Sequence, residues 1–95
     1  MPAATTSSDL LDEAWRLDPS VALRPEPFGA LAYHFGTRKL SFLKTPELVD
    51  VVRGLEHGSV RQALESAGVP AGHWPAYCTA LSGLAAGGMI SRRTA

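Results

Sequence analysis

The stretch YHFGTRKLSFLKTPELVDVV, from Tyr33 to Val52, changes its hydrophobic period halfway along. Up to Lys44 the apolar side chains recur at every second position, which is the period of a β-strand. From Thr45 they recur at every third or fourth position, which is the period of an α-helix. So abrupt a change in a chain of 95 residues predicts a hairpin that leads straight into a helix, and hence an α+β fold.

The hairpin is predicted to turn at Gly36 and Thr37, with glycine supplying a positive φ at the first turn position. The resulting pairs are Tyr33 with Leu40, Leu31 with Phe42, Ala32 with Ser41, and His34 with Lys39. Turn chemistry and hydrophobic alternation select the same register. A longer turn is the alternative, and it would shift these pairs.

The two faces of this hairpin differ in character. We expect the face that carries Leu31, Tyr33, Leu40 and Phe42 to be the core face, because it holds the larger apolar side chains. The side chains of the last strand that point away from the core are then those of Lys39, Ser41 and Leu43.

The N-terminal segment is predicted to hold a tail and a short helix. Residues Met1–Ser8 are small and polar, which is typical of a frayed terminus. Ser8 or Asp9 can cap a helix that reaches about Leu17, with Trp15 as a core anchor on its apolar side.

Three further helices follow the hairpin, and their boundaries are marked by capping residues. The start signals are Thr45 with Pro46, Ser59 with Gln62 in a capping box, and Pro75 in a first turn. The stop signals are Gly58 in a left-handed conformation, Gly68 before Pro70, and Gly87 with Gly88.

The order of elements predicts a three-stranded antiparallel sheet followed by three helices. Pro25 and Pro27 interrupt the first strand, so we expect a sheet that is shortened or bent there. The second and third of these helices can form a helix-turn-helix, which makes the fold winged helix-turn-helix-like. A single domain is expected over residues 17–92, preceded by a tail or short helix over residues 1–16.

Composition excludes several classes of protein. Nine basic residues balance nine acidic ones, whereas nucleic-acid binders carry a basic excess, so we expect no nucleic-acid partner. The single cysteine, Cys78, excludes an internal disulfide and suits a reducing compartment. No apolar run is long enough to cross a membrane, and no signal peptide is recognisable, so a cytoplasmic protein without a membrane partner is expected.

No catalytic constellation is recognisable in the sequence. The three histidines, His34, His57 and His73, have no partners at metal-ligand spacing, and no carboxylate pair stands out. Cys78 lies on the apolar stripe of the last helix, where a cysteine is usually a small buried hydrophobe. We therefore expect a protein that is not an enzyme and that uses neither metal nor cofactor.

The last strand of the hairpin is the strongest candidate for a binding site. Between Pro27 and Pro46 the only fully charged residues are Arg38, Lys39 and Lys44. They are either solvated edge charges that block aggregation or cations that steer an acidic segment toward the strand. An edge strand can bind an extended peptide through its unpaired backbone groups, and Trp74 and Tyr77 are candidates for the wall of a neighbouring groove, although core packing is the commoner role for each.

The sequence LRPEPFGALAYHFGTRKLSFLKTPELVDVVRGL resembles the RiPP recognition element, the peptide-binding domain of pathways that modify ribosomally made peptides. Within that class it closely resembles the peptide chaperones of the mycofactocin pathway, over roughly Leu17 to Arg92. The resemblance implies a chaperone that binds the leader of a precursor peptide by strand addition and presents it to a radical S-adenosylmethionine maturase.

The same resemblance implies where the leader binds, namely along the third strand and beside the third helix of the predicted trio. The candidate residues are Arg38, Lys39, Leu40, Ser41, Phe42, Leu43, Lys44, His73, Trp74, Tyr77 and Leu81. An exposed edge also permits either a monomer or a weak homodimer.

A winged-helix DNA-binding regulator is the alternative function. Its recognition helix would need groups that contact bases and phosphates. The third helix of the trio, PAYCTALSGLAAGG, carries no charge at all, which disfavours this alternative.

Overall fold

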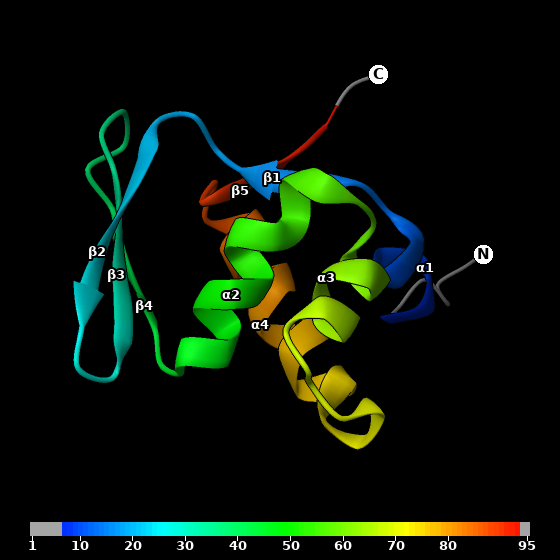
Figure 1. Ribbon diagram of the computed structural model, residues 1–95. Helices are drawn as coiled ribbons and strands as arrows, with labels where there is room; N and C mark the ends of the chain where they lie inside the picture. The colour runs from blue at the N-terminus through cyan, green and yellow to red at the C-terminus, as the bar shows by residue number, and fades with distance from the viewer. Residues whose placement is uncertain (1–6, 94–95) are drawn as a thin grey trace.

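Three antiparallel strands in the order β2–β3–β4 form one layer of the structure, and helices cover one face of that layer (Figure 1). The computed structural model describes residues 7–93, so most of the predicted N-terminal tail lies outside the described residues. The elements are α1 (Ser7–Asp12), β1 (Trp15–Leu17), β2 (Val21–Glu26), β3 (Gly29–His34), β4 (Leu40–Leu43), α2 (Pro46–Gly54), η1 (Leu55–His57), α3 (Val60–Ser66), η2 (Ala71–His73), α4 (Trp74–Ala86) and β5 (Ile90–Arg92). The predicted α+β class and the order of three strands before three helices are confirmed.

The predicted register of the hairpin is also confirmed, but the two-residue turn is wrong. Tyr33 pairs with Leu40, and the pairs continue along β3 and β4 as expected. The connection is a four-residue loop over Phe35–Arg38, in which the carbonyl of His34 accepts from the Arg38 N–H at 2.7 Å. Arg38, rather than a glycine, has the positive φ, at 64°. The loop is longer by one residue on each side of the predicted turn, so the pairs do not shift.

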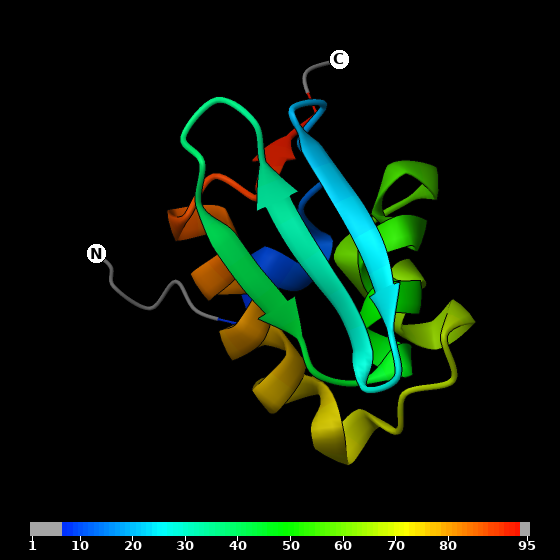
Figure 2. The same cartoon turned by 90° about the vertical axis from the view of Figure 1, so that its left-hand side faces the viewer.

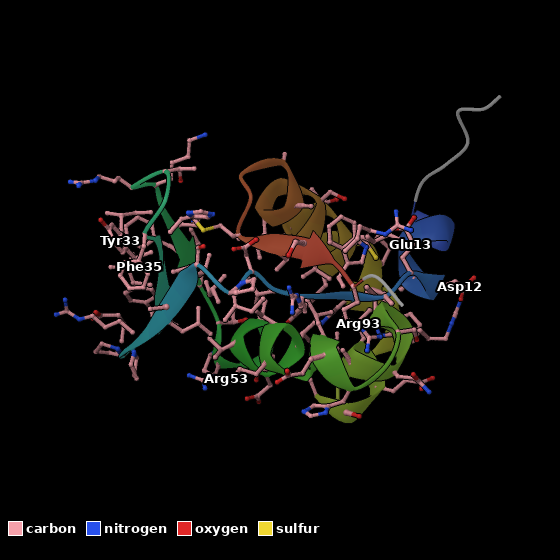
Figure 3. The ribbon with its side chains drawn as sticks, turned by 90° about the horizontal axis from the view of Figure 1, so that it is seen from above. Asp12, Glu13, Tyr33, Phe35, Arg53 and Arg93 are labelled. Carbon is pink, nitrogen blue, oxygen red and sulfur yellow. The ribbon has the colours of Figure 1, made fainter. Side chains whose placement is uncertain are left out.

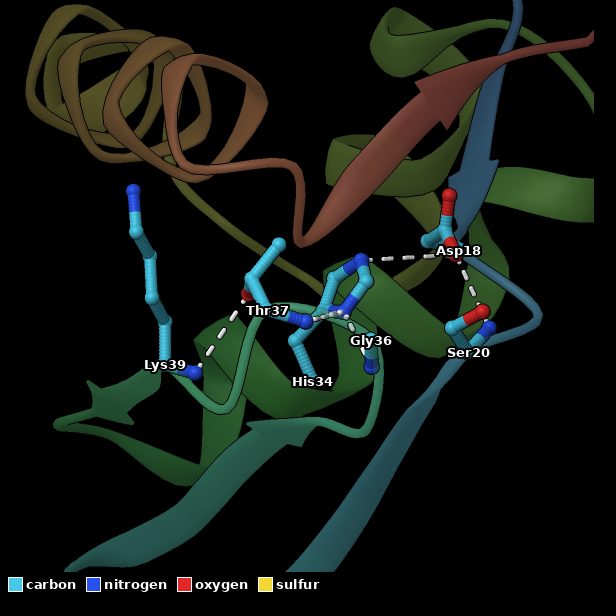
Figure 4. A network of polar contacts seen from close by, with 6 residues as sticks. All are labelled: Asp18, Ser20, His34, Gly36, Thr37 and Lys39. Atoms are coloured by element: carbon cyan, nitrogen blue, oxygen red, sulfur yellow. Dashed lines mark hydrogen bonds and ion pairs between the residues drawn. The ribbon is translucent and has the colours of Figure 1, made fainter.

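The side chain of His34 explains why the longer loop forms. Its Nδ1 accepts from the backbone N–H groups of Gly36 and Thr37, at 3.0 and 3.1 Å (Figure 4). The Thr37 hydroxyl in turn accepts from the N–H of Lys39 at 3.3 Å. These side chains accept hydrogen bonds from backbone N–H groups of the loop, and so they stabilise the four-residue loop over a two-residue turn.

The prediction of which face is the core face is wrong. Ala30, Ala32 and Leu43 are each only 1% exposed, and they pack into the core cluster. Leu40 and Phe42 are instead 56% and 59% exposed, on the side of the sheet away from the helices. We call this side the outer face; its large apolar residues are Phe28, Leu31, Tyr33, Phe35, Leu40 and Phe42. Figure 3 shows Tyr33 and Phe35 on that side.

Small side chains on the inner face account for this inversion. The core cluster joins Ala30 and Ala32 to the inward stripe of α2, formed by Leu48, Val51 and Val52. Because an alanine side chain is short, the backbone of the central strand can approach the helix closely, and the volume of the core comes from the helix side chains. Burying the larger residues of the other face here would hold the two layers further apart.

Gly29 permits a second close approach, at the start of β3. Its φ is 154°, and a Cβ at this position would collide with the carbonyl oxygen of Leu43. Glycine is therefore required where β4 leaves the sheet and turns toward α2.

The expected shortening of the sheet at the prolines does not occur, since β2 runs through Pro25 to Glu26 and turns at Pro27 and Phe28. Proline is tolerated because β2 is an edge strand.

The caps predicted for the three helices after the hairpin are confirmed with one exception, whereas Ser8 and Asp9, predicted to cap the N-terminal helix, lie within α1. Thr45 Oγ1 accepts from the N–H of Leu48 at 3.1 Å, and Ser59 with Gln62 forms the reciprocal capping box. Gly58 is not a left-handed stop, because its φ of 171° is extended and α2 already ends at Gly54. The 3₁₀ turn η1 then carries the chain from α2 to α3.

The predicted N-terminal helix is too long, and its second half is a strand. Helix α1 ends at Asp12, and β1 pairs with β5 so that Trp15 lies opposite Arg92. Trp15 is half-buried, with the Arg92 guanidinium carbon 5.5 Å from its ring centroid. A two-stranded ribbon thus ties the two ends of the described chain together.

Arg93 secures this ribbon to the helical layer. Its backbone N–H donates to Ala14, and its guanidinium donates to the carbonyls of Glu56 and Gly58 at 3.0 and 2.7 Å. The side chain therefore satisfies carbonyl groups at the junction between η1 and α3, and Figure 3 shows it reaching in among the helices.

We predict that Arg93→Ala lowers the free energy of unfolding by about 2 kcal/mol, because hydrogen bonds from a charged donor are lost at two carbonyl groups. The neighbouring Arg92→Ala is the matched control. The side chain of Arg92 is exposed, and among the described residues it has only a ring contact and an ion pair to lose, so its cost is about 1 kcal/mol or less. Urea unfolding followed by circular dichroism measures both, and equal costs would contradict the role given to Arg93.

Candidate functional site

Within the described residues, strand β4 pairs with β3 alone and therefore has one free edge. The N–H of His34 donates to the carbonyl of Lys39 at 2.9 Å, which identifies this pair as hydrogen-bonded. Hydrogen-bonded and non-hydrogen-bonded pairs alternate along an antiparallel ladder. The N–H and C=O groups of Ser41 therefore face β3, and those of Leu40 and Phe42 face outward.

A groove runs along this free edge, between β4 and α4. Its volume is about 410 Å³, and it is lined by Ser41, Phe42, Leu43, Lys44, Leu48, Ala80, Gly83 and Leu84. An adjoining hollow of about 170 Å³ shares Lys44, Leu48 and Ala80 with it and adds Thr45, Ala76 and Tyr77. Figure 2 shows α4 beside β4 and behind the plane of the sheet. An extended chain added to β4 would therefore lie over an apolar floor.

Small residues on α4 keep this groove open. Ala76, Ala80 and Gly83 are spaced by four and three positions, so they lie on one side of the helix. Apart from its own chain neighbours and helix backbone, a Cβ added to Gly83 would meet no atom of the described residues within 4 Å. The opposite side of α4 carries Cys78 and Leu81, which are buried in the core. We did not predict these groove residues, although small residues at helical spacing were visible in the sequence.

The predicted site residues do not all lie at the groove. Those on the strand and its flanks, from Arg38 to Lys44, follow the free edge, with the exposed cations at its two ends. Tyr77 lines the hollow beside the groove. Leu81 is fully buried in the core.

Two predicted residues, His73 and Trp74, are not among those that line the groove or the adjoining hollow. The indole N–H of Trp74 donates to the carbonyl of Val69 at 2.8 Å, and Arg61 of α3 lies 5.9 Å from its ring centroid. Trp74 thus packs at the end of α4 against α3 and the loop before it. His73 is exposed in the preceding 3₁₀ turn.

A polar network holds the hairpin loop that carries Arg38 and Lys39 (Figure 4). The Asp18 carboxylate accepts from the N–H of Ser20 at 2.8 Å, and it lies 3.8 Å from Nε2 of His34. The hydrogen bond from Ser20 is the main cause that lowers the pKa of Asp18, and His34 contributes to the same shift. The ionised carboxylate links the segment before β2 to the histidine that organises the loop.

Within residues 7–93, no group of three or more histidine, cysteine or acidic side chains is placed to hold a metal ion. None of the helices in that range is both long and apolar enough to span a membrane. The predicted burial of Cys78 is confirmed, at 2% exposure. What the described chain offers for recognition is an unpaired strand edge beside an apolar groove.

Comparison with known proteins finds clear relatives. The family described as peptide chaperone MftB matches residues 14–91. Peptide chaperone MftB of Mycobacterium ulcerans is 55% identical over 80 residues, which cover 83% of this chain and 73% of the relative. The Mycobacterium tuberculosis protein of the same name is 52% identical over 83 residues, covering 86% and 76%. That of Mycolicibacterium smegmatis is 52% identical over 80 residues, covering 83% and 78%. No solved structure matches the chain.

We predict that Gly83→Ala raises the free energy of unfolding by about 0.5–1 kcal/mol, because it removes an exposed glycine from a helix interior without a clash. Gly88→Ala is the matched control. It places a Cβ at a φ of 78°, so it lowers stability by about 1 kcal/mol or more. Urea unfolding of the two variants gives the signs, and a destabilising Gly83→Ala would mean that this wall of the groove is not open.

Proposed function

The chain belongs to the peptide chaperone MftB family, and from this premise we propose that it binds the leader of a ribosomally made precursor peptide and presents it to a radical S-adenosylmethionine maturase. The leader adds as a strand to the free edge of β4. Strand addition makes and breaks only hydrogen bonds and packing contacts, so this role requires no catalytic group.

The observation that carries the proposal is the outward direction of the backbone groups of Leu40 and Phe42. Together they offer two N–H donors and two C=O acceptors at an edge beside which a groove lies open. An extended peptide can satisfy all four groups, whatever its side chains, because every residue except proline carries the same backbone donor and acceptor.

Backbone pairing alone would not hold the leader tightly. Four hydrogen bonds at about 1 kcal/mol each amount to a Kd of only about 1 mM, even before the entropic cost of association. The groove must therefore contribute a large part of the affinity. Alternate residues of an added strand point into it, over Leu48 and Ala80, so we infer a leader with apolar residues at every second position.

The cations at the ends of β4 favour acidic residues in the leader. Arg38 and Lys39 are exposed at the hairpin loop, and Lys44 is exposed where the strand ends. Charges placed at the rim of a site accelerate encounter more than they strengthen the final complex. They would thus attract an acidic leader and place it in line with the strand.

The DNA-binding alternative is less well supported. Helix α4 carries no charged residue, and the whole chain has no net charge. Binding to duplex DNA depends largely on cations that contact phosphates. A titration with duplex DNA serves as the control for each peptide experiment below.

We predict that Phe42→Pro weakens binding of the precursor peptide by about fivefold more than Phe42→Ala does, since only the proline removes an outward N–H worth about 1 kcal/mol. Both variants lose the same ring, so their difference isolates the backbone donor. Ser41→Pro is unsuitable here, because the N–H of Ser41 faces β3. Calorimetry gives the two Kd values, with a synthetic precursor peptide whose gene lies nearest to the gene for this protein.

Folding of each variant is checked by NMR, in which the labelled wild-type protein should also show peptide-induced shifts along β4 and the Ala80 side of α4. A folded Phe42→Pro protein that binds as well as Phe42→Ala would rule out strand addition at this edge.

We also predict that Arg38→Glu with Lys39→Glu slows peptide association several-fold at low salt and reduces its dependence on ionic strength, with a smaller effect on dissociation. Arg53→Glu, an exposed cation on α2 away from the groove, is the matched control. Stopped-flow kinetics at two salt concentrations measure the rates. Identical rates for the loop variant and the control would count against steering by the loop.

A further inference from the structure

The outer face of the sheet is an exposed apolar layer that the proposed peptide site leaves uncovered. All four large hydrophobic residues that are exposed in the described chain lie on it: Phe28, Phe35, Leu40 and Phe42, at 42%, 61%, 56% and 59%. Aromatic rings on this face contact one another in two pairs. The Phe28 and Phe42 rings meet edge to face at 6.0 Å between centroids, and those of Tyr33 and Phe35 at 5.2 Å.

The layer is continuous across two strands. Leu31 lies opposite Phe42, and Tyr33 lies opposite Leu40, so the two aromatic pairs are joined through neighbouring residues of β3 and β4. Figure 2 shows this face turned toward the viewer, with all the helices behind it. Soluble proteins seldom expose clustered aromatic residues without a partner that covers them.

The charge around the outer face indicates the kind of partner. The sheet segment over residues 21–44 carries four basic residues and one acidic residue, whereas the rest of the sequence carries five basic and eight acidic ones. The one acid, Glu26, is 3.2 Å from Arg24, which leaves the three cations of the hairpin, Arg38, Lys39 and Lys44, without an acid in that segment to offset them. A second copy docked face to face would bring two such basic margins together, which is unfavourable.

The position of the peptide-binding edge also indicates which partner could cover the outer face. A strand added to β4 continues the pleat of the sheet, so its alternate side chains appear on the outer face next to Leu40 and Phe42. A protein docked on the outer face would then contact the chaperone and the bound peptide at once. This is the arrangement that an enzyme acting on the same peptide would need.

We propose that the outer face is the docking surface for the peptide-modifying enzyme, which contributes an apolar patch bordered by acidic residues. The proposal rests on the proposed function, since it takes the maturase as the partner. It assigns the two tasks of the chaperone to two sides of one strand: the edge and groove hold the leader, and the outer face binds the enzyme.

The test compares two sets of variants in two binding measurements. Leu31→Thr, Tyr33→Thr and Phe35→Thr are combined in one protein, which changes the outer face only at the central strand and its loop, away from the free edge. Threonine keeps a high strand propensity. Ala80→Arg fills the groove and leaves the outer face intact. The purified maturase and the synthetic precursor peptide are each titrated against both proteins.

The triple variant should lose affinity for the maturase by about tenfold or more, because aromatic anchors carry most of the energy of an interface, while its Kd for the peptide stays within about twofold. Ala80→Arg should lose affinity for the peptide, while its Kd for the maturase stays within about twofold. Phe35→Ser alone, at an exposed loop position, repeats the test if the triple variant folds poorly, as judged by NMR.

Maturase binding that is unchanged in a folded triple variant or in Phe35→Ser would overturn this proposal and leave the peptide site standing. A wild-type protein that binds no peptide would instead refute the proposed function. Sedimentation tests whether a second copy of the chain covers the outer face instead. A wild-type dimer that becomes a monomer in the triple variant would show that it does, and this result would also overturn the proposal.

Discussion

The packing of the alanine side of β3 against α2 is the contact on which the rest of this structure depends. Ala30 and Ala32 are almost fully buried, and they bring the sheet backbone close to the stripe of Leu48, Val51 and Val52. Once that side is fixed, Leu43 points inward, and the larger side chains of the hairpin are left outside. The same contact therefore sets which side of β4 meets the groove and which side meets solvent.

In the two proposals, strand β4 serves two forms of recognition within four residues. Its edge offers backbone groups, which any extended peptide can pair with, so selectivity there depends on the groove walls and on the cations at each end. Its outward side chains, Leu40 and Phe42, belong to the apolar outer face, which we propose as a docking surface for a folded partner. Because side chains of an added strand would emerge on both sides, neither surface is independent of the peptide.

Much of the local structure could be predicted because its causes are local. The caps at Thr45 and Ser59, the proline at the start of α4 and the register of the hairpin follow from residues within a few positions of one another. The ribbon of β1 and β5 could not be predicted in this way. It joins Trp15 to Arg92, and three-residue strands carry too short a pattern to distinguish a strand from a helix end. The contacts of Trp74 could not be predicted for a similar reason, since its partners on α3 and near Val69 are set by how the helices pack.

The sequence by itself determined the α+β class, the order of the elements, the pairing of β3 with β4 and the resemblance to a peptide-binding family. The alternation that defines a strand separates two faces but does not say which of them is buried. Hydrophobicity pointed to the face of Leu40 and Phe42, whereas the tertiary structure placed Ala30 and Ala32 inside. The reason is that the helices fill the core and leave room at the central strand only for short side chains. The groove and the outer face were likewise decided by tertiary structure, since each exists only where distant elements meet or fail to cover one another.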